Sequence, residues 1–108
     1  MITNAAVTLW HKSVDKVSRM DVYQRTVFPA VSLQPDLITV LTEGGVKSAN
    51  VLKIRIPTSE EITVSNGDRL MIGVREELNP PAEADTVMAW ADNRKGTKAM
   101  WHYKVVAG

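Results

Sequence analysis

Hydrophobic and polar residues alternate with a period of two along most of the chain, which is the pattern of half-buried β-strands. The clearest case is the segment 46–56, whose second half places apolar side chains on one face and the cations Lys53 and Arg55 on the other. Pro57 ends this alternation because proline cannot donate to a strand ladder, and Pro29 is expected to end an earlier strand for the same reason. Similar patterns predict strands at 5–12, 21–28, 37–42, 61–64, 68–74, 86–91 and 99–106.

Turn signals separate the predicted strands. Glu43-Gly44-Gly45 follows one apolar segment, and glycine-rich turns of this kind close β-hairpins. Ser65-Asn66-Gly67 lies between the segments 61–64 and 68–74. Because Asn-Gly between apolar runs favours a tight hairpin turn, those two segments are predicted to pair with each other. The polar stretch 92–98 joins the last two predicted strands in the same way.

Two longer segments interrupt the alternation. Residues 12–21 are polar and are expected to form a loop or a short helix. Residues 75–85 contain the pair Pro80-Pro81 and three glutamates, so they are expected to be extended and exposed. Short strands at close spacing predict an all-β fold, a small β-barrel or sandwich with antiparallel hairpins and extended loops. A chain of 108 residues fits a single domain, residues 1–108.

Composition narrows the possible functions. The formal net charge is +1, which is too small to indicate a surface for nucleic acid or for a membrane by itself. Since there is no cysteine, the chain can form neither a disulfide framework nor a thiolate zinc site. The first residues lack the basic and apolar regions of a signal peptide, and no apolar run reaches the roughly 20 residues that span a bilayer. We therefore expect a soluble protein inside a cell, with no membrane partner.

Few residues are candidates for chemistry. Asp68 follows the Asn-Gly turn and could act as a base or a metal ligand, but Asx residues at tight turns usually bond the local backbone, so a structural role is expected. His11 and His102 lie in strands near the two termini, which often pair in a barrel, yet the sequence supplies no recognisable further ligands for a metal. There is no phosphate-binding glycine loop and no nucleophile elbow. We expect no catalytic residue, cofactor, metal or small-molecule substrate; an enzyme or metalloprotein is the least supported class.

Cations and aromatic residues keep a further class open. Arg94, Lys95 and Lys98 lie in the last hairpin turn, with Trp90 and Trp101 nearby in the sequence. A basic surface beside aromatic rings is typical of small barrels that bind nucleic acid. The near-neutral charge favours instead a solvated rim, and the alternation of the tryptophans predicts that they lie in the core. A nucleic-acid-binding small barrel is therefore the alternative function.

Five stretches in a fixed order carry a resemblance to a known family. They are ITNAAVTLWHK, ANVLKIRIP, GDRLMIG, VMAWADNRKG and WHYKVVAG. In this order they resemble small proteins of tailed bacteriophages and Gram-positive prophages, which are minor capsid or head–tail joining proteins or have no assigned role. The resemblance covers most of the chain and is weakest over residues 12–41.

The resemblance implies a structural role in the neck or tail of the particle and no catalysis. Head-closure and tail-terminator proteins are usually β-barrels with extended loops, so one of these roles is expected, through a homo-oligomeric ring that contacts neighbouring neck or tail proteins. Assembly would take place in the bacterial host cytoplasm, and the assembled protein would belong to the virion. The residues expected to contact neighbouring proteins or passing DNA lie in the last hairpin turn and the proline-containing loop: Asp92, Asn93, Arg94, Lys95, Pro80 and Pro81.

Overall fold

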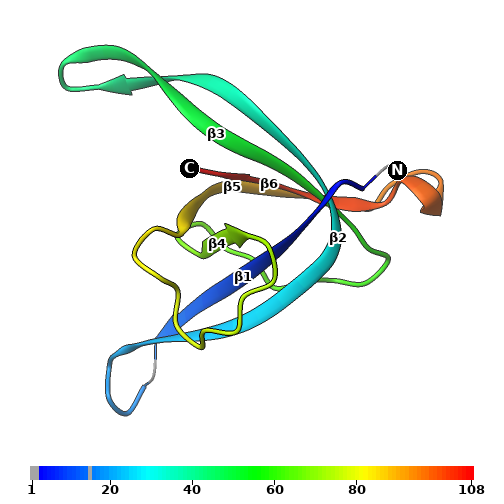
Figure 1. Ribbon diagram of the computed structural model, residues 1–108, viewed down its shortest axis with the longest axis horizontal. Coiled ribbons are helices and arrows are strands. Elements are labelled where there is room, and N and C mark those ends of the chain that lie inside the picture. Colours follow the sequence, from blue (N-terminus) through cyan, green and yellow to red (C-terminus); the bar gives the residue numbers. More distant parts are fainter. Residues whose placement is uncertain (1–2, 15) are drawn as a thin grey trace.

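Six antiparallel strands close into one barrel in the order β1-β2-β3-β6-β5-β4 (Figure 1). The computed structural model describes residues 3–14 and 16–108, and the side chains of residues 38–42 and 47–49 lie outside that description. The all-β class and the small barrel expected from the sequence are confirmed. Within the described ranges, no helix is long and apolar enough to cross a membrane. The elements are β1 (Ala5–Val14), β2 (Asp21–Thr42), β3 (Gly45–Pro57), β4 (Arg69–Ile72), β5 (Asp85–Asn93), the short 3₁₀ helix η1 (Lys98–Met100) and β6 (His102–Ala107).

The short strand β4 closes the barrel because β1 occupies one of its edges and β5 the other. The hairpin predicted for residues 61–64 and 68–74 is therefore wrong. Residues 61–64 form no strand, since β4 offers them no unoccupied edge. The Asn-Gly turn is nevertheless present. Gly67 has a φ of 93°, in the left-handed region that glycine adopts without strain, and the Asp68 N–H donates to the Ser65 carbonyl over 3.1 Å.

The longest strand, β2, belongs to two hairpins. It pairs with β1 up to Val31 and with β3 from Ser32 onward. The expectation that Pro29 ends this strand is wrong, because Pro29 falls in a register shift between β1 and β2, where its missing N–H removes no ladder bond. Residues 12–14 continue β1 and pair with residues 21–23. Of the loop or short helix expected at 12–21, the loop is present at residues 16–20, and residues 12–14 and 21 belong to the two strands of the hairpin.

The interior of the barrel is filled by aliphatic side chains and one tyrosine. β3 contributes Ile54 and Ile56, as its alternation predicts, while Arg55 stays exposed. The same alternation places Val51 on the face of Lys53 and Arg55, but Val51 is buried. The C-terminal Gly108 approaches it so closely that a side-chain carbon there would lie 3.2 Å from Val51 Cγ1. The core consists of Val7, Leu9, Val31, Ile54, Ile56, Val64, Leu70, Val87, Tyr103, Val105 and Ala107.

β1 is buried on both of its faces. Thr8 and Trp10 alternate with the residues that point into the barrel, yet both are 0% exposed. The loop 75–85, yellow in Figure 1, covers them. The Trp10 indole N–H donates to the Glu77 carbonyl over 2.9 Å, and the Arg75 N–H donates to the Thr8 hydroxyl over 2.9 Å. Residues 76–79, 82 and 83 are exposed, as expected. The loop also covers β1, which the sequence did not predict, and its backbone bonds the polar groups on the outer face of that strand.

Candidate functional site

A two-stranded arm projects from the barrel at the ends of β2 and β3 (Figure 1). This β2–β3 arm comprises residues 36–51, in which residues 36–42 pair with residues 45–51. β6 pairs with β3 only from Leu52 onward, and β1 pairs with β2 only up to Val31. Among the described residues, no third strand therefore pairs with either outer edge of the arm. Apart from the tip and the Leu37 N–H, which donates to the Asp36 carboxylate over 2.8 Å, the outward backbone N–H and C=O groups of both strands are open to a further strand.

Where the side chains of the arm are described, all except that of Val51 are exposed. Leu37 and Val46 are 60% and 67% exposed, and a two-stranded hairpin without a packed face is at best marginally stable in water. Its paired residues at about 3.3 Å each give it a length of roughly 23 Å. The radius of gyration of 14.7 Å accordingly exceeds the about 13 Å typical of a chain of this length. The arm thus presents apolar side chains and open edges to its surroundings.

The base of the arm is held firmly to the barrel. The Asn4 side chain donates to the Leu33 carbonyl over 3.0 Å and accepts from the Leu33 N–H over 2.9 Å, so it completes the edge of β2 at this point. Lys53 Nζ lies 2.6 Å from Asp36 Oδ2. This hydrogen bond, with that from the Leu37 N–H, lowers the pKa of Asp36. The direction of the arm is therefore fixed where it leaves the barrel.

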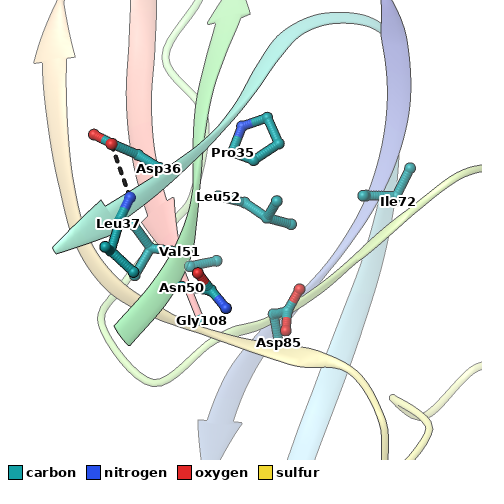
Figure 2. Close-up of a pocket in the computed structure, with 10 residues that line it drawn as sticks. Pro35, Asp36, Leu37, Asn50, Val51, Leu52, Ile72, Asp85 and Gly108 are labelled. Atoms are coloured by element: carbon teal, nitrogen blue, oxygen red, sulfur yellow. Dashed lines mark hydrogen bonds between the residues drawn. The ribbon is translucent and has the colours of Figure 1, made fainter. Parts of the chain in front are cut away.

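An open groove of about 640 Å³ lies between the base of the arm and the end of the barrel (Figure 2). Leu37 from the arm and Ile72 from β4 contribute exposed apolar side chains to opposite walls. Asp36 and Asp85 also line the groove and supply its two carboxylates. A groove of this composition suits an apolar segment of another chain. Its lining consists of Pro35, Asp36, Leu37, Asn50, Val51, Leu52, Ile72, Asp85, Ala107 and Gly108.

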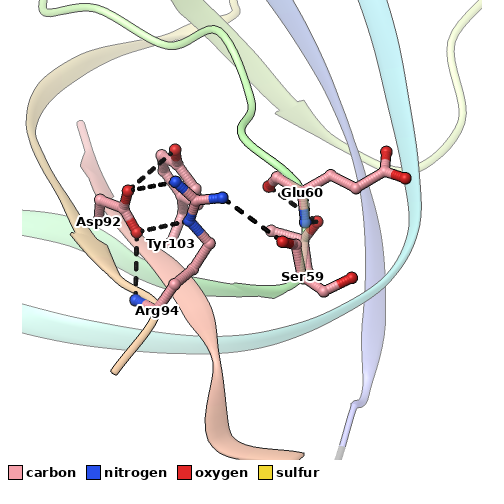
Figure 3. A network of polar contacts seen from close by, with 6 residues as sticks. Ser59, Glu60, Asp92, Arg94 and Tyr103 are labelled. Atoms are coloured by element: carbon pink, nitrogen blue, oxygen red, sulfur yellow. Dashed lines mark hydrogen bonds and ion pairs between the residues drawn. The ribbon is translucent and has the colours of Figure 1, made fainter. Parts of the chain in front are cut away.

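In the last hairpin turn, Arg94 is held by an acid of the same turn (Figure 3). Its guanidinium donates to the two Asp92 carboxylate oxygens over 2.9 and 2.8 Å and lies 5.4 Å from the centroid of the Tyr103 ring. The hydrogen bond from Arg94 lowers the pKa of Asp92 to about 2, and the same bond raises the pKa of Arg94. Arg94 also donates to the Ser59 carbonyl over 3.4 Å. Arg94 therefore fixes the shape of the turn, while Lys95 remains exposed.

Pro80 and Pro81 lie far from that turn. Both are half-buried in the loop that covers β1. The Arg69 guanidinium fixes this loop by donating to the carbonyls of Pro81, Ala82 and Ala84 over 3.5, 3.2 and 2.7 Å. The loop precedes β5 and the basic turn follows it, and a strand of nine residues is about 30 Å long. The two groups of predicted contact residues are thus not brought together.

Asp68 is a buried carboxylate, 1% exposed, with three partners. It accepts from the Ser65 N–H over 2.8 Å and from the Lys12 N–H over 3.0 Å, and it lies 2.9 Å from His11 Nδ1. The first contact shapes the Asn-Gly turn, as expected of an Asx residue. The other two attach that turn to β1.

The two histidines do not meet. His11 lies in β1 and His102 in β6, and these strands are not neighbours in the barrel. The expectation that the terminal strands pair is wrong, because β2 and β3 separate them on one side and β4 and β5 on the other. His102 instead lies 3.4 Å from the Asn93 amide nitrogen and 2.9 Å from the Met100 carbonyl. Among the described residues, no three His, Asp or Glu side chains are grouped so that they could hold a metal.

The tryptophans do not all lie in the core, contrary to the prediction. Trp10 is fully buried, but Trp90 is 44% exposed. β4 pairs with β5 only at Asp85 and Thr86, so the later part of β5 lacks the cover that β4 would provide. Trp101 is half-buried.

The arm itself was not predicted. The sequence indicated both of its strands, but not that they leave the barrel together. The available signal is Asn50, which falls on the same alternating face as Leu52 and Ile54. A polar residue at that position indicates that this face of the strand faces the core only from Leu52 onward, and that the preceding residues lie outside the barrel.

The fold and these surfaces define a small antiparallel β-barrel whose distinguishing features are a projecting arm, an apolar groove and a basic turn. Residues 2–108 match the family described as "Family of unknown function (DUF6751)", and the chain belongs to that family. No curated protein matches the chain.

Proposed function

We propose that this protein is a structural subunit of a tailed bacteriophage or prophage particle, a head–tail joining protein of the head-closure or tail-terminator type that acts by ring assembly. The resemblance of five ordered stretches to minor capsid and head–tail joining proteins supports the phage context. The observation that carries the assembly role is the β2–β3 arm, residues 36–51, with its open edges and exposed apolar side chains.

The physical argument is that the arm is stabilised by association. An edge strand can be completed by a strand of another chain, which supplies main-chain hydrogen bonds and apolar contacts together. The apolar groove beside the arm gives each subunit a second, different surface. Contact between unlike surfaces of identical chains repeats from copy to copy and closes into a ring when the rotation allows. The partner of the arm is therefore a second copy of this chain.

In this proposal the protein binds and positions, and it catalyses no reaction. Lys95 in the basic turn and the neighbouring Asp92–Arg94 pair are the surface for an adjacent neck or tail protein or for passing DNA. The subunits assemble in the cytoplasm of the bacterial host and remain in the virion.

Electron microscopy of particles from an induced lysogen tests the phage role. With this gene deleted, the proposal predicts separate heads and tails, or tails of uncontrolled length in the case of a tail terminator. Intact, infectious virions from the deletion strain would refute it.

Complementation of the deletion with a shortened arm tests the assembly role. Because Asp36 and Val51 lie opposite each other, residues 37–50 can be replaced by Asn-Gly, which closes two-residue hairpins. The barrel is expected to fold and complementation to fail. Lys16→Gln, at an exposed position outside both the arm and the basic turn, serves as a control variant. Full complementation by the shortened protein would show that the arm is not the assembly element.

A further inference from the structure

Two positively charged side chains lie opposite each other on the outer face of the barrel. Arg55 of β3 and Lys104 of β6 are direct cross-strand partners. Like charges in this position destabilise a sheet, and neither side chain has an ion pair or hydrogen bond within the described part of the chain. The nearby Lys53, in contrast, is neutralised by Asp36 at 2.6 Å. Unfavourable pairings such as these two adjacent cations are expected mainly at functional sites.

These charges line a polar hollow of about 170 Å³. Three cations face a single carboxylate there, and that carboxylate is already bonded to Lys53. Ser32 and Gln34 add a hydroxyl and an amide that can donate hydrogen bonds. The volume corresponds to roughly six water molecules, which leaves room for a tetrahedral oxyanion. Arginine and lysine side chains supply the charge-assisted hydrogen bonds that a phosphate group requires.

A second hollow of about 220 Å³ adjoins the first. Lys104 lines both hollows, and otherwise the second one is lined by Ala89, Trp90, Ala91 and Val106. Ala91 lies directly opposite Lys104 across β5 and β6. The Trp90 ring is not part of this outer surface, because Trp90 pairs with Val105 and stacks on the Tyr103 ring, with centroids 6.2 Å apart, on the other face of the strands. The outer apolar surface of the small side chains beside a phosphate-sized cationic hollow leaves room for a base next to a bound backbone phosphate.

We propose that the outer face formed by β2, β3, β6 and β5 binds single-stranded nucleic acid, with a backbone phosphate at Arg55 and Lys104 and a base over the hollow at Ala89–Ala91. A duplex presents no unpaired base to the second hollow. Apart from Asp36, which is bonded to Lys53, the site uses no residue of the β2–β3 arm, and it does not require ring assembly. It can therefore fail while the proposed function stands.

Fluorescence anisotropy of a labelled oligothymidylate, titrated with the protein over a series of salt concentrations, tests the site. The wild-type protein is expected to bind at low salt, with affinity that falls as salt rises. Arg55→Gln and Lys104→Gln should each weaken binding and reduce the slope of log affinity against log salt by about 0.7, the value for one phosphate contact in a single strand. Both variants should fold, because each relieves a like-charge repulsion.

Lys16→Gln is the matched control, since it removes one charge from an exposed turn outside both hollows. It should leave the affinity and the slope unchanged. Absence of wild-type binding at low salt, or an equal effect of Lys16→Gln and the two hollow variants, would overturn the proposal.

Ala91→Glu tests the second hollow, because it places a negative charge on an exposed position. It should weaken binding at all salt concentrations by about 10-fold, because the added carboxylate fills the hollow and repels the neighbouring backbone phosphate. Equal or tighter binding of a duplex of the same length would overturn the assignment to single strands.

Discussion

The barrel and the β2–β3 arm are built from the same strands but differ in how their residues are stabilised. In β1, Thr8 and Trp10 are 0% exposed although they point away from the interior, because the loop 75–85 covers them. In the arm, Leu37 and Val46 are exposed to most of their extent, and β2 and β3 pair only with each other. Alternating apolar residues thus lead to closure in one region and to projection in the other.

The difference shows that two strands can pair along their whole length and still leave their outer edges without a partner. The barrel satisfies its edges internally, since each strand has two neighbours in the closed order. The arm begins where β1 and β6 stop pairing with β2 and β3. Beyond that point the chain keeps its β-structure while the described side chains other than Val51 are exposed. In our account a second copy supplies further contacts there.

The largest expected effect is on the covered face of β1. Trp10→Ala removes a fully buried ring and its hydrogen bond to the Glu77 carbonyl, so we expect a loss of about 3–5 kcal/mol in the free energy of unfolding. Urea denaturation measures it. Trp90→Ala is the control, because it removes the same ring from a half-exposed site and should cost much less. Equal losses would show that the loop does not seal the barrel.

A smaller effect is expected at the buried carboxylate. Asp68→Ala leaves the N–H groups of Ser65 and Lys12 without their acceptor, and each buried unsatisfied group costs about 1–3 kcal/mol. Urea denaturation should therefore show a loss of this order, and hydrogen exchange of the two amides should accelerate. Unchanged exchange at Lys12 would contradict the proposed attachment of the turn to β1.

Lowering the pH should remove the stabilising contribution of the Asp92–Arg94 pair in the last hairpin turn. The pKa of Asp92 is lowered from 3.8 to about 2 by Arg94. A carboxylate with a lowered folded-state pKa stabilises the fold above its ordinary pKa, and this contribution is lost as the pH falls through the folded value. The unfolding free energy of the wild type should therefore fall more steeply between pH 4 and pH 2 than that of Asp92→Asn. Parallel curves for the two proteins would refute the assignment. The pKa of Asp36 is also lowered, but both proteins contain Asp36, so its contribution to the pH dependence is the same in each.

The smallest effect on folding is expected in the arm. Leu37→Ser and Val46→Ser change exposed side chains, so the unfolding free energy of the monomer should stay within about 0.5 kcal/mol of the wild type. Self-association, followed by sedimentation velocity, should weaken in both variants. A loss of stability comparable to that of Trp10→Ala would mean that the arm packs on its own barrel.

The sequence predicted the barrel better than the surfaces. The period-two pattern located β1, β3, β5 and β6, and the burial of Ile54 and Ile56 followed from it. It failed for Pro29, because a bulge depends on the register of the partner strand. It failed for residues 61–64 because the local hairpin signal carries no information about which strands already occupy the edges of β4.

The candidate site was predicted less well for a related reason. The sequence predicts Arg94 as a contact residue but not its bond to Asp92, which depends on the geometry of the turn. The opposition of Arg55 and Lys104 arises from residues 49 positions apart that meet only through the register of β3 and β6. Long-range pairing therefore creates the surfaces, and a single sequence shows only their parts.

Hydrogen–deuterium exchange measured over a range of protein concentrations tests the central claim most directly. If a second copy completes the arm, the outward amides of residues 36–51 become more protected as the concentration rises, while the amides of the barrel core keep a constant rate. If the arm amides exchange equally fast at every concentration, the arm is not completed by another copy and the assembly role assigned to it is wrong.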